Sequence, residues 1–423
     1  MGNVEISGSF ETFPDNKGSV INRALGEIVV PAAIPPTISQ PGKPRIIHLR
    51  SLEELRAAAS DWDDLWRRSE VTFPTMRAEL LAQWVEHFAA DAEFHAVAVR
   101  QGGHWVAALP MVRRKIGRLI EAGVLPCNQW SSSGECLIDF SADVNQIMPV
   151  FLDALVECNW PLLWLDEAIL ETARWQAFMR AVADGRLKHV VRPRWQVGWV
   201  RINGDWEAYR ARWSRKHRQH TAWAARQLAR QGDVRLVLHS HLAAGEAAIW
   251  MQKALEIEDL GWKGRTGGSV KSVPGMSEFF IRQAEQLAAW GQLELAFLEC
   301  GGRPIAFCYG QSAKGVFHSA KVGYDPRYAR FSPGQLLRYF LLKRFYAEPG
   351  RVAIDFLGPL TESHAHWRPE TYTVARFAVA LNSLGRMALW AYKRLGRRGQ
   401  WAVGREQWAG NREQDNWSGV VTK

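Results

Sequence analysis

An order of predicted elements that occurs twice is the feature of this sequence that most limits its fold. In the first half, two helical patterns precede a hairpin with a Gly-Gly turn, a helix and a strand, at residues 52–66, 77–89, 94–113, 146–158 and 162–165. In the second half the same order occurs at residues 242–260, 276–290, 293–310, 334–347 and 351–358. The similarity lies in the pattern and not in residue identity. It predicts two related α/β lobes.

The length of the chain agrees with two lobes. A chain of 423 residues, 47% of them hydrophobic, is too long for one ordinary domain. We expect a disordered leader, an N-terminal lobe, a C-terminal lobe and a flexible basic tail, at residues 1–44, 45–195, 196–395 and 396–423.

Positive charge is concentrated in two segments. Residues 207–231 and 386–423 account for the whole formal excess of +10. Such surfaces attract nucleic acid, acidic lipid or a phosphate-rich cofactor. The first segment lies in a helix expected at residues 205–230, whose Trp and Tyr side chains fall near one face. A solvated basic face is the simplest interpretation of this helix, and tRNA or an anionic membrane surface are the alternatives.

Cysteine usage indicates a reducing compartment. The five cysteines are odd in number and no pair has CxxC spacing. We therefore expect reduced, mostly buried thiols and a cytoplasmic location. Because no Cys/His cluster has ligand spacing, no metal site is expected. No run of about 18 uninterrupted apolar residues occurs, so no transmembrane helix is expected either.

The most informative motif is a helix start that follows a strand and a basic loop. Ser332, Pro333 and Gly334 stand where the helix begins, where unpaired N–H groups and the helix dipole favour an anion. Arg327 and Arg330 precede them and can pair with phosphate. The competing interpretation is an ordinary helix start with proline in the first turn.

Four segments of the second half resemble the GNAT-related acyltransferases of the CelD-like or BioF-like family, which are related to the FemAB/FemX aminoacyltransferases. They are WSRKHRQH at 213–220, EIEDLGWKG at 256–264, GYDPRY at 323–328 with SPG at 332–334, and DFLG at 355–358. The resemblance covers residues 197–380 well, and the first lobe matches more loosely.

The resemblance implies two tandem GNAT-like lobes of the α/β (α+β) class, each a mixed, mostly antiparallel sheet flanked by helices. It also implies acetyl-CoA or another acyl-CoA as co-substrate and no metal. The implied phosphate-binding residues are Arg327, Arg330, Ser332, Pro333, Gly334 and Gln335. The implied acceptor-binding residues are Trp262, Lys263 and Tyr324.

Acyl transfer from a thioester to an amine needs a neutral amine, a polarised carbonyl and a protonated leaving thiolate. In GNAT folds, backbone N–H groups polarise the carbonyl, and here these would lie at residues 317–322. The candidate proton acceptors are Asp355, Glu256, His318 and His366. Asp355 ends an apolar strand and fits a turn equally well, whereas His318 lies inside a strand, as core histidines do.

The segment after DFLG departs from the family pattern. Relatives often carry a lysine there, whereas this chain reads TESHAHWRPE at 361–370, with His364 or His366 in that place.

The leading hypothesis is an acyl-CoA-dependent N-acyltransferase acting on an amino sugar, a polysaccharide precursor or another amine. The alternatives are a FemX-like transferase that uses aminoacyl-tRNA and a non-catalytic binding protein in envelope polysaccharide synthesis. Peripheral membrane contact and the oligomeric state stay open.

Overall fold

The computed structural model describes residues 42–117 and 119–395. The leader expected at 1–44 lies almost entirely outside these residues, and the tail expected at 396–423 lies wholly outside them.

Within the described residues, the first half of the chain forms seven strands and six helical segments. The strands are β1 (Arg45–Leu49), β2 (Phe94–Gln101), β3 (His104–Ile116), β4 (Ile120–Val124), β5 (Leu137–Ile138), β6 (Leu162–Ile169) and β7 (His189–Arg201). The helices are α1 (Leu52–Ala57), α2 (Ala59–Arg67), η1 (Pro74–Met76), α3 (Ala78–Phe88), α4 (Val144–Val156) and α5 (Ala173–Asp184).

Up to residue 395, where the described part of the chain ends, the second half forms six strands among its helices. The strands are β8 (Val234–Ser240), β9 (Leu293–Cys300), β10 (Arg303–Ala313), β11 (Val316–Tyr324), β12 (Ala353–Asp355) and β13 (Glu370–Ala380). The helices are α6 (Trp206–Ala211), α7 (Arg215–Ala229), α8 (Ala244–Leu260), α9 (Trp262–Arg265), α10 (Met276–Ala289), η2 (Pro326–Phe331), α11 (Pro333–Tyr346), α12 (Glu362–Ala365) and α13 (Ser383–Leu395).

The described strands join into one sheet that runs through both lobes. Its order is β1-β2-β3-β4-β6-β13-β7-β12-β11-β10-β9-β8, with β5 paired to β3. The two ends of the sheet follow the same plan. From each edge, four antiparallel strands are followed by a strand that is parallel to the fourth: β6 is parallel to β4, and β12 is parallel to β11. The predicted fold class, two α/β lobes with mixed and mostly antiparallel sheets, is confirmed.

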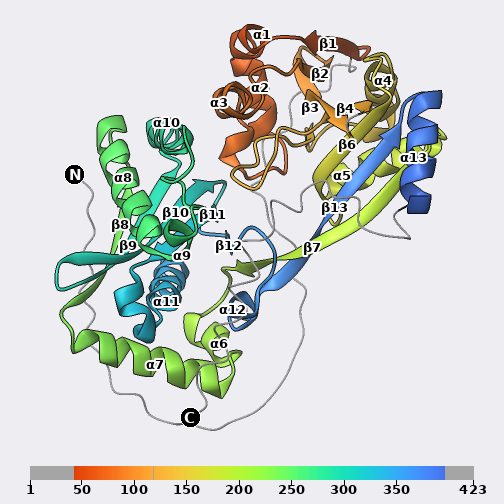
Figure 1. Ribbon diagram of the computed structural model, residues 1–423. Helices are drawn as coiled ribbons and strands as arrows, with labels where there is room; N and C mark the ends of the chain where they lie inside the picture. The colour runs from red at the N-terminus through yellow and green to blue at the C-terminus, as the bar shows by residue number, and fades with distance from the viewer. Residues whose placement is uncertain (1–41, 118, 396–423) are drawn as a thin grey trace.

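The lobes exchange their innermost strands. β7 is the last strand of the first half but pairs with β12 of the second lobe, and β13 is the last strand of the second half but pairs with β6 of the first. The two long strands pair with each other along nearly their whole length and cross between the lobes (Figure 1). The lobe change expected near residue 195 therefore falls inside a continuous strand.

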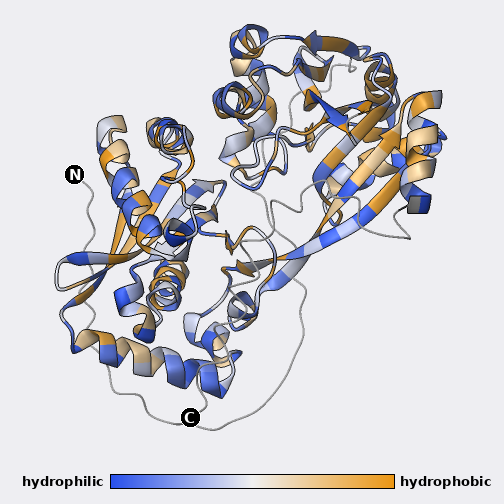
Figure 2. Ribbon diagram, viewed as in Figure 1, coloured by the Kyte–Doolittle hydropathy of each residue, from blue (hydrophilic) through white to orange (hydrophobic). Residues whose placement is uncertain are grey.

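Both faces of the sheet are buried, which explains the near-continuous apolar runs of its strands. In β2, Ala96 and Ala98 face one core while Val97 and Val99 face another, as a period of two requires. Hydrophobic residues accordingly gather on the strands of both lobes (Figure 2). Helices α4 and α5 cover one face of the N-terminal half, and α7 and α11 cover one face of the C-terminal half.

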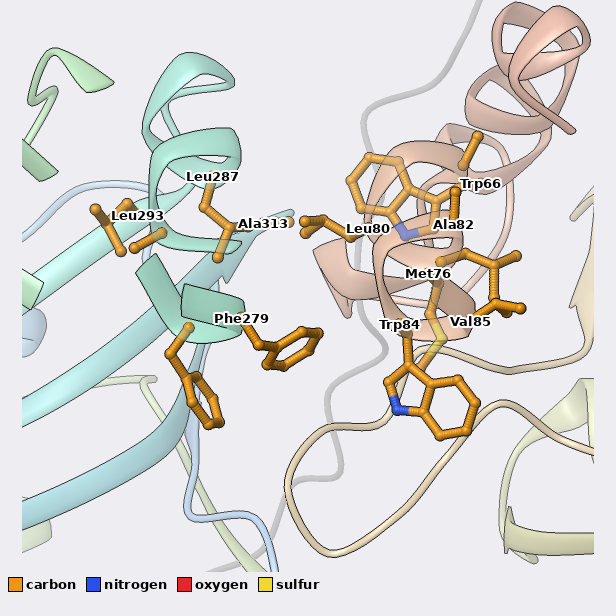
Figure 3. Close-up of a cluster of buried hydrophobic side chains, with 14 of the residues drawn as sticks. Trp66, Met76, Leu80, Ala82, Trp84, Val85, Phe279, Leu287, Leu293 and Ala313 are labelled. Atoms are coloured by element: carbon orange, nitrogen blue, oxygen red, sulfur yellow. The ribbon is translucent and has the colours of Figure 1, made fainter. Parts of the chain in front are cut away.

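One apolar cluster joins the lobes on the other face. It contains α1 to α3 of the first lobe together with α8 and α10 of the second. Figure 3 shows Leu80 of α3 and Phe279 and Leu287 of α10 in this cluster. Since burial of such side chains contributes about 1.5–3 kcal/mol each, the cluster fixes the lobes against each other.

The single helix expected at residues 205–230 is instead two helices. α6 ends after Ala211, and α7 begins after Ser214, whose side chain accepts a hydrogen bond from the His217 N–H. A serine in extended conformation at this place is a strong helix cap, so it starts a new helix. None of the described helices is long and apolar enough to cross a membrane.

Candidate active site

The sheet opens between β11 and β12. These parallel strands pair over only three positions, and the last pair is His318 with Asp355. β12 ends there, while β11 continues to Tyr324. Opposite β10, the register of β11 skips Ala320, which is therefore the extra residue of a β-bulge. The end of the short strand, the bulge and the freed edge of β11 thus lie together, within the segment expected to polarise a carbonyl.

A hydroxyl, an imidazole and a carboxyl group line up at this point. Thr72 Oγ1 lies 3.0 Å from His318 Nε2, and His318 Nδ1 lies 3.6 Å from Asp355 Oδ2. Tyr372 donates its hydroxyl proton to the same Oδ2 at 2.9 Å, and the Leu357 N–H donates to Oδ1 at 2.9 Å. The structure therefore brings together two of the four candidate proton acceptors.

Both lobes contribute to this line. Thr72 lies before η1 of the first lobe, and Phe73 stacks on the His318 ring with centroids 4.2 Å apart. His318 is 1% exposed and Asp355 6% exposed, and the hydroxyl of the half-buried Thr72 lies against the imidazole. Burial, followed by the charge of Asp355, raises the pKa of Tyr372 well above its usual value, which keeps its hydroxyl a donor.

A lysine holds the two lobes in register beside the site. Lys314, in the turn between β10 and β11, donates to the carbonyl oxygens of Trp66, Ser69 and Val71 at 2.5, 2.8 and 2.7 Å. These carbonyls lie at the end of α2 and in the segment that leads to Thr72. These three hydrogen bonds of Lys314 therefore fix the position of Thr72 relative to β11.

The start of α11 has few protein partners for its backbone and for the Ser332 side chain. Ser332 is left-handed, with φ of 51°, and makes no side-chain cap; its hydroxyl instead lies 3.1 Å from His220 Nε2 of α7. Pro333 has no N–H, and the Gln335 N–H donates to the Ser332 carbonyl. Among the described residues, the Gly334 N–H has no protein acceptor, so it is available to an anion.

The side chains around the start of α11 differ in how strongly other residues hold them. Arg327 is held by Asp325 through several hydrogen bonds, which lower the pKa of that carboxyl, whereas Arg330 is exposed and lies over the Phe331 ring. Gln335 accepts a hydrogen bond from Trp367 at 2.7 Å. Of the two arginines, Arg330 has the guanidinium group that is more accessible to a ligand.

The remaining candidates lie around α8 and α12. Glu256 is exposed and accepts a hydrogen bond from Gln252, so its carboxyl group is not part of the buried line. Lys263 donates to Glu258 at 2.9 Å, and Trp262 is half-buried beside it. His366 is exposed and stacks on His217 at 5.4 Å, and Tyr324 is 42% exposed, next to Gly334.

Sequence reasoning missed the buried carboxyl group of α8. Glu258 is 3% exposed and also accepts the Val270 N–H at 3.0 Å. Burial opposes its charge, but Lys263 and Lys321 outweigh that cost and lower its pKa. A helical position two residues after Glu256 faces a different side of the helix, so the spacing could have separated the two.

Sequence reasoning also missed Lys321. It lies on β11 next to the bulge, 9% exposed, with its ammonium group 4.8 Å from the Trp130 ring of the first lobe and 4.3 Å from Phe280. Burial lowers the pKa of Lys321 to about 7, although Glu258 acts in the opposite direction. Thr72, Tyr372 and Lys321 carry no motif, and their roles depend on contacts across the lobes.

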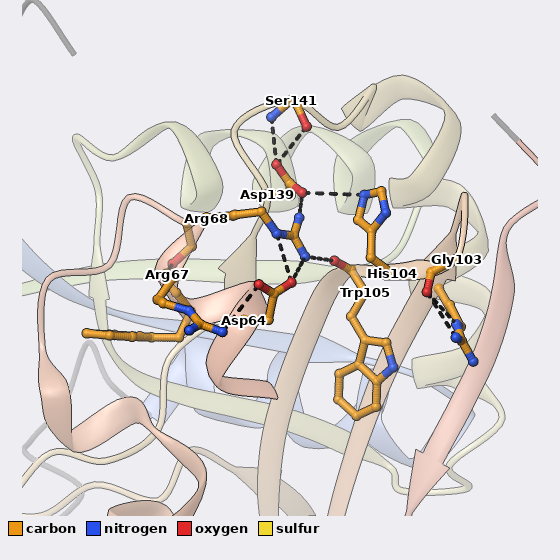
Figure 4. Close-up of polar contacts among 11 residues, drawn as sticks. Asp64, Arg67, Arg68, Gly103, His104, Trp105, Asp139 and Ser141 are labelled. Carbon is orange, nitrogen blue, oxygen red and sulfur yellow. Dashed lines mark hydrogen bonds and ion pairs between the residues drawn. The ribbon is translucent and has the colours of Figure 1, made fainter. Parts of the chain in front are cut away.

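The first lobe contains the buried carboxylate of Asp139, whose partners are side chains and backbone groups of the fold. Asp139 forms an ion pair with Arg68 and accepts hydrogen bonds from the Ser141 N–H and hydroxyl, both at 2.8 Å (Figure 4). Arg68 also binds Asp64 and the Trp105 carbonyl. A buried carboxylate with this many partners is structural, and it offers no free proton acceptor.

A family model and several solved structures are similar to this chain. Residues 215–367 match the family model of the acetyltransferase (GNAT) domain. No curated protein matches the sequence.

Solved structures with a similar arrangement have low sequence identity. One is the C-terminal DUF2156 domain of an Agrobacterium fabrum protein described as a lysylphosphatidylglycerol synthetase, 12% identical, with a TM-score of 0.47, over 82% of this chain and 99% of that one. FemX is 13% identical over 82% and 99%, with a TM-score of 0.46. A tandem GNAT protein from the clavulanic acid biosynthesis pathway is 11% identical over 79% and 98%, with a TM-score of 0.42.

These likenesses carry no inference about what this chain binds. The segment that matches the acetyltransferase (GNAT) domain model begins with α7 and ends at Trp367, and so contains the opening between β11 and β12, His318, Asp355 and the start of α11.

Proposed function

We propose that this chain is an N-acyltransferase that moves an acyl group from CoA to an amine at the opening between β11 and β12. The observation that carries the proposal is the Thr72–His318–Asp355 line at the last paired position of these strands, of which His318 and Asp355 lie inside the segment that matches the GNAT domain. A cytoplasmic location belongs to the proposal, since CoA thioesters are made there.

The line supplies a path for the proton of the acceptor amine. As the amine nitrogen attacks the thioester carbon, its proton passes to the Thr72 hydroxyl while that hydroxyl gives its own proton to His318 Nε2. Asp355, held by Tyr372, stabilises the imidazolium that forms. The amide bond forms, the C–S bond breaks, and the departing thiolate takes up the proton held by the imidazolium.

Backbone N–H groups near the bulge at Ala320 polarise the thioester carbonyl in this proposal. A bulge removes its residue from the strand ladder, so that its N–H is not committed to a neighbouring strand. Donors fixed in place before the reaction lower the barrier more than donors that must reorient, and one such donor contributes on the order of 3 kcal/mol.

The CoA phosphates belong at the start of α11 in this proposal. The Gly334 N–H, the Ser332 hydroxyl and the exposed Arg330 surround this helix end, and His220 lies against Ser332. Arg327 joins them only if a phosphate displaces Asp325. We place the acceptor amine towards Trp262, Lys263 and Tyr324, and its class, an amino sugar, polysaccharide precursor or other amine, is part of the proposal.

The test is acetyl-CoA binding followed by an acceptor screen. We expect acetyl-CoA to raise the melting temperature of the full chain and amines from a panel of amino sugars to release CoA thiol. His318→Gln should abolish thiol release without abolishing acetyl-CoA binding. If the wild type does not bind acetyl-CoA, the proposal is wrong.

A second donor is favoured by one observation, the basic surface of α7. Arg215, Lys216, Arg226 and Arg230 are all exposed on this helix, whose start lies beside α11. A row of cations of this kind suits a polyphosphate backbone, so aminoacyl-tRNA is the alternative donor. If tRNA raises the melting temperature and acetyl-CoA does not, the donor is tRNA. If a glycan alone does so, the chain is a binding protein.

A further inference from the structure

Three metal-ligand side chains from distant parts of the sequence meet in the first lobe. His48 Nδ1 lies 3.0 Å from His95 Nε2, and Cys158 Sγ lies 3.9 Å from the same His95 nitrogen. One ligand atom from each residue lies within 4.8 Å of the others. The sequence spacing gave no sign of this group, which is unrelated to the β11–β12 opening.

The fold explains why the three side chains converge. His48 of β1 pairs with Val97 of β2, and His95 precedes Val97 by two residues, so both imidazoles lie on one face of the sheet. That face is covered by α4, and Cys158 follows the end of this helix. Trp160 packs edge-on against His95, with ring centroids 5.6 Å apart.

The distances are close to those of a metal site. Zinc binds imidazole nitrogen at about 2.0–2.1 Å and thiolate sulfur at about 2.3 Å, so tetrahedral ligands lie roughly 3.3–3.6 Å apart. The observed nitrogen–nitrogen and nitrogen–sulfur distances are 3.0 and 3.9 Å. These two distances lie about 0.3 Å from the tetrahedral range, and the ligand atoms of His48 and Cys158 lie within 4.8 Å of each other, so one ion can contact all three atoms after side-chain adjustment.

The ligand types also suit zinc. Imidazole nitrogen and thiolate sulfur are the donors that zinc sites in proteins commonly use. A bound divalent ion displaces the thiol proton of Cys158 to solvent, since a coordinating thiol is deprotonated outright.

The charges around the cluster are mixed. Arg50 opposes a cation near His48, whereas Glu157 and Glu93 favour one. Glu157 precedes Cys158, and its carboxyl group is the nearest in sequence that can complete the coordination; a water molecule is the other choice. His48 and Cys158 are only half-buried, so an ion can enter from solvent.

We propose that His48, His95 and Cys158 bind one zinc ion that ties the edge strand β1 to the end of α4. The competing description is a pair of neutral imidazoles sharing one proton, with the Cys158 thiol directed to the Ala154 carbonyl at 3.4 Å. The two descriptions differ in metal content, which can be measured directly.

The experiment uses the full chain, purified with a tag that contains no histidine and dialysed against metal-free buffer. We expect about one zinc per chain in the wild type, and less than a tenth of that in Cys158→Ser and in His48→Gln. The control is Cys127→Ser, which removes a half-buried thiol of the same lobe outside the cluster and should keep its zinc. Zinc-free wild type, or equal zinc in wild type and Cys158→Ser, would overturn the proposal.

Cobalt substitution gives a readout that does not depend on the stability of the variants. Apo wild type titrated with Co²⁺ should develop a thiolate-to-cobalt charge-transfer band that saturates at one equivalent. The same titration of His48→Gln, a change on a half-exposed edge strand, should give no band at the same concentration. A wild type that develops no band contradicts the assignment of Cys158 as a ligand. Acetyl-CoA binding is measured in parallel and should be unchanged in both variants, which separates this site from the proposed function.

Discussion

The two lobes have the same strand plan but differ at the position where a parallel pair ends. In the C-terminal lobe the third pair of β11 and β12 is His318 with Asp355. In the N-terminal lobe the third pair of β4 and β6 is Val124 with Trp164. One architecture thus ends in a polar pair in one lobe and an apolar pair in the other, so the backbone plan alone does not make a catalytic site.

The packing beside the ends of these two parallel strand pairs differs as well. In the first lobe, a Cβ on Gly123 of β4 would lie 2.3 Å from the Trp160 ring, so Trp160 fills the space beside this strand. Leu389 of α13 packs on Trp164 and Ala122 in the same apolar cluster. In the second lobe, the corresponding position is occupied by Thr72 and Phe73, which come from the first lobe.

The helices that follow these strands also start differently. α4 is capped by Asp143, whose carboxylate accepts the Asn145 N–H at 3.0 Å. An acidic cap satisfies the helix end and repels an anion. α11 has Ser332 without a side-chain cap, and its Gly334 N–H has no protein acceptor in the part of the chain that the structure describes. The proposed phosphate site at the start of α11 therefore has no counterpart at the capped start of α4.

The largest effect is expected at the polar pair. His318→Gln and Asp355→Asn should each lower kcat by about a hundredfold or more, since general base catalysis contributes on this scale. The measure is CoA thiol release with an acceptor found in the panel. The matched change in the first lobe, Val124→Ala, should leave kcat of the folded protein unchanged. Equal losses in both lobes would break the comparison.

The contribution of the first lobe to the site is tested at Thr72. Thr72→Val keeps the shape and removes the hydroxyl, and we expect kcat to fall by about tenfold to a hundredfold. Thr72→Ser keeps the hydroxyl and should recover most of the rate. If valine and serine behave alike, Thr72 only fills space.

The carboxyl group of Glu167 should affect stability and not catalysis. Burial raises the pKa of Glu167 to about 7. The hydrogen bond from Ser132 lowers this pKa, and the charge of Asp166 raises it. An acid whose pKa is higher in the folded state stabilises the fold at low pH and loses this contribution as pH rises from about 4.5 through 7. Urea unfolding from pH 5 to 8 should therefore show Glu167→Gln gaining on the order of 2 kcal/mol relative to wild type. A loss of kcat in Glu167→Gln would instead give the first lobe a catalytic carboxylate.

The smallest effect is expected at the acidic cap of the first lobe. Asp143→Ala removes the cap of α4 and should lower the free energy of unfolding by about 1 kcal/mol. Acetyl-CoA affinity should not change. An increase in affinity or a second bound acetyl-CoA would mean that the cap alone blocks a site there.

The sequence predicted what depends on local pattern. The hairpins, the start of α11 at Ser332 and the position of Asp355 at a strand end all follow from periodicity and turn residues. β13 was not predicted, and neither was the exchange of β7 and β13, because both depend on pairing between residues far apart in the chain.

The candidate site was predictable only on the C-terminal side. His318 and Asp355 were named from their strands, but Thr72 and Tyr372 become partners of these residues only when the lobes pack and β13 crosses. Glu256 was named from a motif, whereas burial distinguishes Glu258. The helix at residues 205–230 is broken by one serine side chain, which periodicity does not detect.

The most direct test of the account is the number of acetyl-CoA molecules that one chain binds, measured by calorimetry on wild type and two matched variants. Gly334→Glu and Asn145→Glu place the same charge at the second residue of α11 and of α4, and a Cβ at Gly334 meets only Tyr324 at 3.7 Å. We predict one site, lost in Gly334→Glu and unchanged in Asn145→Glu. Two sites per chain, or binding that survives Gly334→Glu, would contradict the account.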